Sequence, residues 1–191
     1  MMHAFLAFDL SKQAKENLGG LIRSLQTQTK SVRWIEPEKL HCTLKFFREI
    51  DEMVLKESVS QTIQQTAQKL SPVFLECVGV GVFPNWKYPS ILWAGFTGEV
   101  ETVVGWHTQL EEAFASYKIP KDPRQFRMHV TFGRMKSPVK KAAWLKTLEK
   151  MVTYSFGKVP VDRLTLYKSE LTKEGAVYTP LMEFPLKSLI T

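Results

Sequence analysis

The chain has 191 residues, 44% of them hydrophobic and 12% aromatic, which is enough to fill a core and excludes a low-complexity chain. No run of about 18 apolar residues occurs, and the start MMHAFLAFDLSKQ lacks the features of a signal peptide, so we expect a cytoplasmic protein without a membrane partner. The 26 Lys and Arg residues against 19 Asp and Glu, a formal charge of +7, favour an anionic partner such as a nucleotide or nucleic acid.

The first half of the chain alternates strand patterns with helical patterns. Ser11 is a typical helix N-cap residue and stands between the first strand pattern and the first helical one. Apolar residues recur at helical spacing from Asp51 to Leu70. In chain order we expect a strand at 3–10, a helix from Ser11 to about Gln28, strands at 31–35 and 40–47, and a helix at 51–70.

The second half repeats this alternation and ends in two further strand patterns. Pro138 is suited to the first turn of a helix. In chain order we expect strands at 72–83 and 90–96 around the turn PNWKYP, a helix at about 99–117, the loop IPKDP, a strand at 125–134, a helix at about 138–152, and strands at 158–171 and 176–186 joined around TKEG.

A histidine followed at +2 by a threonine occurs in two of these strands, as His41 with Thr43 and as His129 with Thr131. The two motifs lie 129 − 41 = 88 residues apart, and each strand runs into a predicted helix. This repeat indicates an α+β fold of two similar lobes, each an antiparallel-rich sheet with helices outside, and an active-site groove between them. We expect residues 1–191 to form a single domain with these two pseudo-symmetric lobes.

Side chains of a strand alternate between its two faces, so each histidine shares a face with its threonine. Strict alternation gives the first motif a polar face and an apolar face, and the second motif the same. The polar faces would carry His41, Thr43, Lys45 and Phe47 on one strand and His129, Thr131 and Gly133 on the other. If the two strands face each other across the groove, two imidazoles and two hydroxyls converge.

Two imidazoles with ordinary pKa values near 6.5 can give and take a proton in one step at neutral pH. Threonine hydroxyls can donate hydrogen bonds to phosphate oxygens. This pairing suits a substrate with an already activated leaving group, such as a strained five-membered cyclic phosphate. It would need no metal and no other cofactor.

The ordered motifs, with WIEPEKLH before the first, resemble the two-histidine (2H) phosphoesterases, and within them the RNA 2′,3′-cyclic phosphodiesterases once called bacterial 2′-5′ RNA ligases. The resemblance runs from HAFLAFDL through GVFPNW and SILWAGF to FRMHVTFGR and LTLYKSEL, nearly the whole chain. It implies metal-independent hydrolysis of RNA or nucleoside 2′,3′-cyclic phosphates to 2′-phosphates. By this resemblance His41 is the acid, His129 is the base, and Thr43 and Thr131 hold the phosphate.

The resemblance also places Arg134 near the nucleotide. Strict alternation would aim this arginine away from His129, so the strand must bend or end there. Relatives commonly have proline where this chain has Met128, and we expect a local backbone change at that point. Lys45 would add positive charge to the site, and Phe47 or Trp34 would stack on a base, although aromatic residues in strands more often belong to the core.

Other interpretations remain open. Cys42 next to His41 suggests a thiol nucleophile, but adjacent strand residues face opposite ways, and Cys42 and Cys77 lack the spacing of a zinc or disulfide site. The same groove would also serve a 2′-5′ RNA ligase, formally the reverse reaction, or a nucleotide- or RNA-binding module without turnover. We expect a monomer whose partner is RNA or a nucleotide ending in a 2′,3′-cyclic phosphate.

Overall fold

The computed structural model has a mixed fold of helices and strands, and the order of its elements largely follows the predicted order. The residues that the structure describes are 1–115, 117, 119–137, 143–173 and 175–187. The strands are β1 (Met2–Asp9), β2 (Val32–Trp34), β3 (His41–Ile50), β4 (Val73–Phe83), β5 (Ile91–Gly98), β6 (Val130–Met135), β7 (Ser155–Val161), β8 (Arg163–Leu171) and β9 (Ala176–Pro185). The helices are α1 (Lys12–Gln26), the short η1 (Pro37–Lys39), α2 (Glu52–Val54), the π-helical η2 (Leu55–Val59), α3 (Ser60–Ala67), α4 (Val100–Ala115) and α5 (Ala143–Glu149).

Two predicted helix starts can be followed in the structure, and one lies outside the described residues. The Ser11 side chain accepts a hydrogen bond from the Ala14 amide, so it caps α1 as predicted. The Asp51 side chain accepts from two amides at the start of α2, and α2, η2 and α3 follow one another without a break. The predicted first turn at Pro138 lies outside the described residues, which resume at α5.

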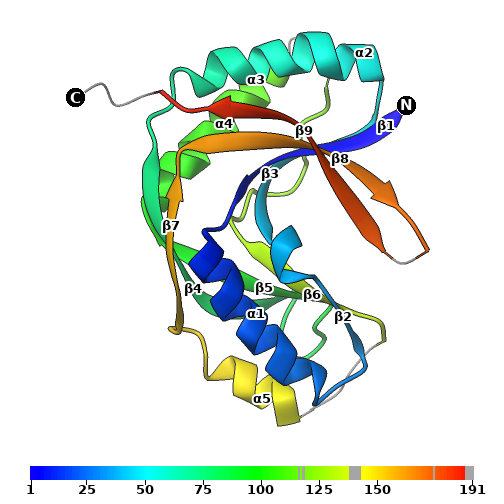
Figure 1. Ribbon diagram of the computed structural model, residues 1–191, viewed down its shortest axis with the longest axis vertical. Helices are drawn as coiled ribbons and strands as arrows, with labels where there is room; N and C mark the ends of the chain where they lie inside the picture. The colour runs from blue at the N-terminus through cyan, green and yellow to red at the C-terminus, as the bar shows by residue number, and fades with distance from the viewer. Residues whose placement is uncertain (116, 118, 138–142, 174, 188–191) are drawn as a thin grey trace.

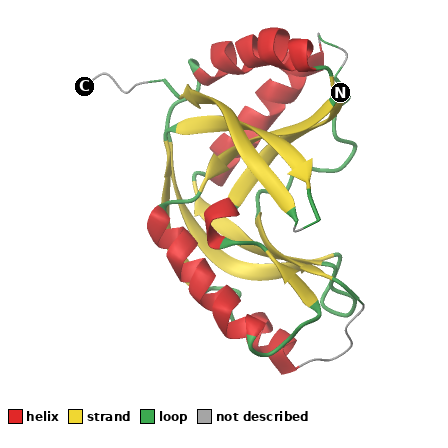
Figure 2. Cartoon of the chain, turned by 45° about the vertical axis from the view of Figure 1, so that its right-hand side comes forward, coloured by secondary structure: helices red, strands yellow, loops and turns green. Residues whose placement is uncertain are grey.

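All nine strands of the described chain join in one curled antiparallel sheet, in the order β7-β4-β5-β6-β3-β1-β8-β9, with β2 pairing to β6. Figure 1 shows β1, β8 and β9 with α2, α3 and α4 in its upper part, and β4, β5 and β6 with α1 and α5 in its lower part. Figure 2 shows the same division from another side, with the helices on the outside of the strands. The predicted α+β class is therefore confirmed.

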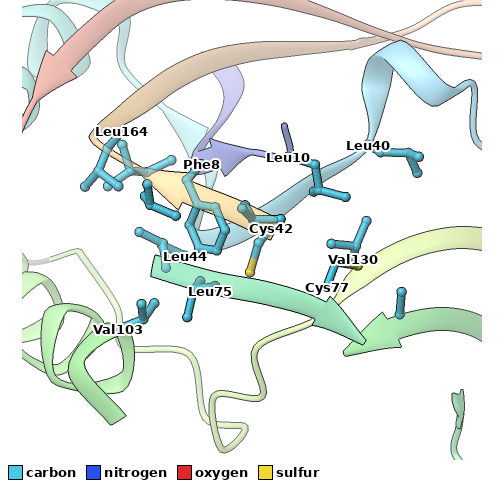
Figure 3. Packing of buried hydrophobic residues seen from close by; sticks show 14 of the residues in the cluster. Phe8, Leu10, Leu40, Cys42, Leu44, Leu75, Cys77, Val103, Val130 and Leu164 are labelled. Atoms are coloured by element: carbon cyan, nitrogen blue, oxygen red, sulfur yellow. The ribbon is translucent and has the colours of Figure 1, made fainter. Parts of the chain in front are cut away.

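The two motif strands are neighbours at the middle of this sheet. Within the described residues, β3 and β6 meet at one antiparallel pair, Cys42 with Val130. Both side chains are fully buried, and Figure 3 shows them in the apolar core with Phe8, Leu44 and Cys77. The core thus fixes one face of both motifs and leaves the other face, with the histidines and threonines, turned away from it.

Each motif strand contains one extra residue, immediately after the threonine. Ala7 of β1 pairs with Thr43 but Leu6 pairs with Lys45, so Leu44 is bulged out of the register. Trp93 of β5 pairs with Thr131 but Leu92 pairs with Gly133, so Phe132 is bulged in the same way. The residue directly after each threonine, Leu44 in β3 and Phe132 in β6, therefore reverses the alternation of side chains in the rest of its strand.

This reversal corrects one prediction and satisfies another. Lys45 and Phe47 do not share the face of His41: they turn into the core with exposed fractions of 4% and 2%, and Phe46 takes their place at 46%. On β6 the same shift brings Arg134 to the face of Thr131, which is the bend that its predicted position required.

Two strands were predicted with the wrong extent. The continuous alternation over 158–171 is broken at Asp162: β7 pairs with β4 at one edge, whereas β8 pairs with β1 on the far side of the centre. The strand predicted at 125–134 begins only at Val130. The segment before it, including Met128, is irregular.

Lys45 forms a buried ion pair on the core side of β3. Its Nζ lies 2.7 Å from Glu111 Oε1 of α4 and donates to the Pro120 carbonyl at 2.7 Å, and Glu111 is itself 6% exposed. Lys45 therefore ties β3, α4 and the segment after α4 together.

Lys45→Met should lower the free energy of unfolding by about 3–5 kcal/mol, because it leaves the Glu111 carboxylate buried without its counter-charge. Urea unfolding followed by circular dichroism measures this loss. The double variant Lys45→Met with Glu111→Leu should recover most of it. Lys56→Met, which breaks the exposed Lys56–Glu52 pair, is the control and should lower the stability far less, because solvent screens an exposed pair. Equal losses in Lys45→Met and Lys56→Met would contradict the buried-pair interpretation.

Candidate active site

His41 sits at the start of β3 against an aromatic wall. Its ring stacks on Phe5 with centroids 4.6 Å apart, and Tyr178 of β9 approaches it edge-on at 5.4 Å. The ring Nδ1 lies 2.7 Å from the Lys39 carbonyl oxygen. Because a carbonyl oxygen only accepts hydrogen bonds, Nδ1 carries the hydrogen and Nε2 is the nitrogen available for chemistry.

His129 is held in a matching way at the start of β6. Its Nδ1 donates to the Arg127 carbonyl at 2.6 Å, again two residues earlier in the chain, so Nε2 is available here too. Phe83 meets the ring edge-on at 5.2 Å and stacks in turn on Trp93. Trp93 can lie flat on the sheet because residue 81 is glycine: a Cβ there would lie 2.2 Å from the indole ring.

The strand register brings the four motif side chains together on one face of the sheet. In the antiparallel pair of Cys42 with Val130, the flanking residues that lie across from each other are His41 with Thr131 and Thr43 with His129. Each imidazole therefore stands next to the hydroxyl of the other motif. A tetrahedral phosphate between the strands would meet two ring nitrogens and two hydroxyl donors.

Two arginines extend this face along β6. Arg33 of β2 pairs directly with Arg134, and both side chains are exposed. Like charges placed directly opposite each other repel, and an anion bound between them relieves the repulsion. The face next to His129 therefore favours a phosphate.

A carboxylate occupies the corresponding place beside His41. Asp9 of β1 pairs with His41 across the strands. The Asp9 carboxylate accepts hydrogen bonds from the Tyr167 hydroxyl at 2.6 Å and from Lys15 Nζ at 2.9 Å, which hold it in position. The two histidines thus have opposite electrostatic neighbours, a carboxylate for one and arginines for the other.

Burial lowers the pKa of both imidazoles below the ordinary value, because desolvation disfavours the charged ring. At His41 the Lys39 carbonyl and Asp9 counteract this effect and raise the pKa, while Lys15 and the second histidine add to the lowering. At His129 the Arg127 carbonyl raises the pKa, and Arg134 and Arg124 lower it. Since the charge of His129 lowers the pKa of His41, protonation of one ring disfavours protonation of the other.

Of the predicted site residues, the structure brings together His41, Thr43, His129, Thr131 and Arg134. It removes Lys45 and Phe47 to the core, and Trp34 packs against Phe132 and Trp144. Phe46 faces the site but was not predicted, because a one-residue bulge leaves no mark in the hydrophobic pattern. Asp9, Tyr167 and Tyr178 were not predicted either, since they come from distant strands that only the fold brings next to His41.

The thiol of Cys42 points away from the site. It is fully buried on the core face, and burial raises its pKa far above the ordinary value, so it is not a nucleophile next to His41. In the part of the chain that the structure describes, no group of three or more His, Cys, Asp or Glu side chains is arranged to hold a metal ion. No helix among the described residues has the length and apolar character needed to cross a membrane.

Comparisons with known proteins agree on one family. The family described as the 2′-5′ RNA ligase superfamily matches residues 13–173. An RNA 2′,3′-cyclic phosphodiesterase of Aquifex aeolicus is 31% identical over 187 residues, covering 97% of this chain and 98% of that protein. A protein of the same name from Methanothermobacter thermautotrophicus is 29% identical over 185 residues, covering 97% and 99%.

Solved structures show the same fold. The crystal structure of TT0787 of Thermus thermophilus superposes with a TM-score of 0.78 at 25% identity, covering 98% of this chain and all of that chain. Escherichia coli LigT, solved in complex with 3′-AMP, superposes with a TM-score of 0.76 at 19% identity over 98% of this chain and 99% of its own.

We predict that the ring protons of His41 and His129 titrate in NMR spectra with pKa values below 6.5, since burial outweighs the carbonyl and carboxylate contacts. The unfolded chain then binds more protons than the folded one between the lowered pKa values and 6.5, so the free energy of unfolding falls as the pH drops through this window. His41→Gln and His129→Gln assign the two signals, and each should flatten the pH dependence of stability below pH 6.5. A value above 6.5 for either ring would contradict the dominance of burial.

Proposed function

The chain belongs to the 2′-5′ RNA ligase superfamily, and from this membership we propose that it hydrolyses RNA 2′,3′-cyclic phosphates. Relatives of nearly the same length, 25–31% identical, carry the name RNA 2′,3′-cyclic phosphodiesterase. The observation that carries the proposal is the convergence of two carbonyl-oriented imidazoles and two threonines on one face of adjacent strands. The substrate class is RNA or a nucleotide that ends in a 2′,3′-cyclic phosphate.

The reaction uses both imidazoles at once and passes no proton through a metal. One Nε2 takes a proton from water as the water oxygen forms a bond to phosphorus. The bond from phosphorus to the O3′ oxygen breaks on the opposite side, and the other imidazole gives its Nε2 proton to that oxygen. The product is a 2′-phosphate with a free 3′-hydroxyl.

The charges around the two rings support His41 as the acid and His129 as the base. Asp9 stands across from His41 and favours its protonated form. Burial lowers the pKa of His129, and Arg134 and Arg124 lower it further, which favours the neutral form that can accept a proton from water.

Thr43 and Thr131 hold the non-bridging phosphate oxygens by donating hydrogen bonds. Arg134 adds a positive charge on the same face, where negative charge accumulates as water attacks. Arg33, its cross-strand partner, completes an anion-binding edge that the sequence analysis did not identify.

We further propose that the two halves of the sheet act as two lobes of a single domain, related by an approximate two-fold axis at the pair of Cys42 with Val130. The matching carbonyl contacts and the matching bulges after the two threonines support this symmetry. The groove then lies between the lobes, and every group in it comes from one chain. We propose that the enzyme works as a monomer, and its two free buried thiols suit the cytoplasm.

Hydrolysis of a nucleoside 2′,3′-cyclic phosphate should continue in excess EDTA, because the two imidazoles carry both proton transfers. His41→Ala and His129→Ala should each lose at least about 10²-fold in kcat/KM, the usual contribution of one acid or base. His3→Ala is the matched control, since His3 is exposed and outside the motifs. Loss of wild-type activity in EDTA with recovery on adding one divalent metal would contradict the mechanism.

A substrate whose leaving group needs no proton separates the two roles. On a nitrophenyl phosphodiester, His41→Ala should recover much of the rate that it loses on the cyclic phosphate, because nitrophenolate departs unprotonated. His129→Ala should stay slow, since water still requires a base. Release of nitrophenolate measures both rates. Recovery by His129→Ala alone would reverse the assignment, and a 3′-phosphate product from the cyclic substrate would overturn the choice of leaving oxygen.

A further inference from the structure

A cleft of about 600 Å³ opens at one end of the active-site face, a volume within the roughly 300–1,000 Å³ range of small-molecule sites. One wall is the second half of β3 from Lys45 onward, with Asp51 and Val54, and the other is formed after α4 by Tyr117 and residues 119–124. The motif histidines and threonines do not line it. The cleft is therefore distinct from the reacting groups.

Phe46 connects the cleft to the site. The bulge at Leu44 turns its ring to the face of His41, where it is 46% exposed. Phe46 stacks on Phe5 with centroids 5.5 Å apart, and Phe5 stacks on His41 at 4.6 Å. A second exposed ring, Tyr117 at 42%, belongs to the other wall. An exposed aromatic ring in a groove is the usual platform for a nucleic-acid base.

The cleft is lined by charges of both signs. Arg48 lies on β3 near Glu49 and Asp51, and Lys121 and Arg124 lie on the opposite segment with Asp122. The Asp122 carboxylate accepts hydrogen bonds from Arg124 Nε at 3.1 Å and Nη2 at 2.8 Å, which fix the direction of the guanidinium. Arg124, which lines the cleft, also lowers the pKa of His129, so its charge is within electrostatic reach of the second motif.

The wall that carries Arg124 is held by a hydrogen bond from the core side of β3. The buried Lys45 ammonium donates to the Pro120 carbonyl at 2.7 Å while pairing with Glu111. Lys45, which was predicted to bind the substrate, instead holds the two walls of the cleft together.

We propose that this cleft binds the nucleotide that precedes the cyclic-phosphate end of an RNA, with its base on Phe46 and its phosphate near Arg124. The inference rests on the proposed function. A 2′,3′-cyclic phosphate closes the 3′ end of the chain, so only the 5′ side of the terminal nucleoside continues into further RNA. The enzyme then prefers RNA ends to free nucleoside cyclic phosphates.

The test compares kcat/KM for a dinucleotide that ends in a 2′,3′-cyclic phosphate with kcat/KM for the corresponding nucleoside cyclic phosphate. Base–aromatic stacking predicts a preference of roughly 5- to 150-fold for the dinucleotide in the wild-type protein. Phe46→Ala should reduce this ratio to about one, and Phe46→Trp should keep it. Any indirect effect of Phe46→Ala on His41 through Phe5 acts on both substrates and cancels in the ratio.

Phe74→Ala is the matched control, because Phe74 is a 69% exposed phenylalanine of β4 outside the cleft, and the ratio should not change. A dinucleotide that lacks the first base should lose the preference in the wild-type protein as well. A wild-type ratio near one, with the nucleoside substrate hydrolysed, would overturn the inference and leave the proposed function intact. A preference that survives both Phe46→Ala and removal of the base would also overturn it, and failure to hydrolyse either substrate would overturn both.

Discussion

The pairing of β3 with β6 at Cys42 and Val130 is the contact on which the site depends. Within the described residues these two strands share only this pair, yet it brings together motifs 88 residues apart, since 129 − 41 = 88. Burial of both side chains in the apolar core holds the strands in register. A shift of either strand by one residue would turn its histidine into the core, so hydrophobic packing on one face determines the chemistry on the other.

The alternating pattern of the strands was sufficient to predict which motif residues share a face. It placed His41 with Thr43 and His129 with Thr131, and these placements agree with the register. It failed two positions after each threonine, at Lys45 and Gly133, because an inserted residue changes the pairing without changing the composition of the strand. Lys45 shows the consequence: a lysine in a strand is usually solvated, and nothing local indicates that Glu111, 66 residues later (111 − 45), provides a buried partner.

Long-range pairing set the other limit of prediction from sequence. Residues 158–171 alternate as one strand, but β7 and β8 have partners on opposite sides of the sheet centre. Hydrogen bonding to β4 and to β1 decides where the chain turns, and neither partner is visible in the local pattern. The same holds for Asp9, which becomes relevant to His41 only through strand pairing. Helices were easier, because caps such as Ser11 and Asp51 act within three residues.

The orientation of both imidazoles by main-chain carbonyls has a consequence for how such a site changes under mutation. In many histidine sites a carboxylate fixes the ring, and one substitution removes it. Here the acceptors are the carbonyls of Lys39 and Arg127, which every amino acid possesses. Alanine scanning would therefore not reveal the groups that select the reactive nitrogen. The side chains at positions 39 and 127 can vary while the orientation of the two rings stays the same. Only a change in the path of the backbone, such as an insertion or deletion just before either motif, would release the rings.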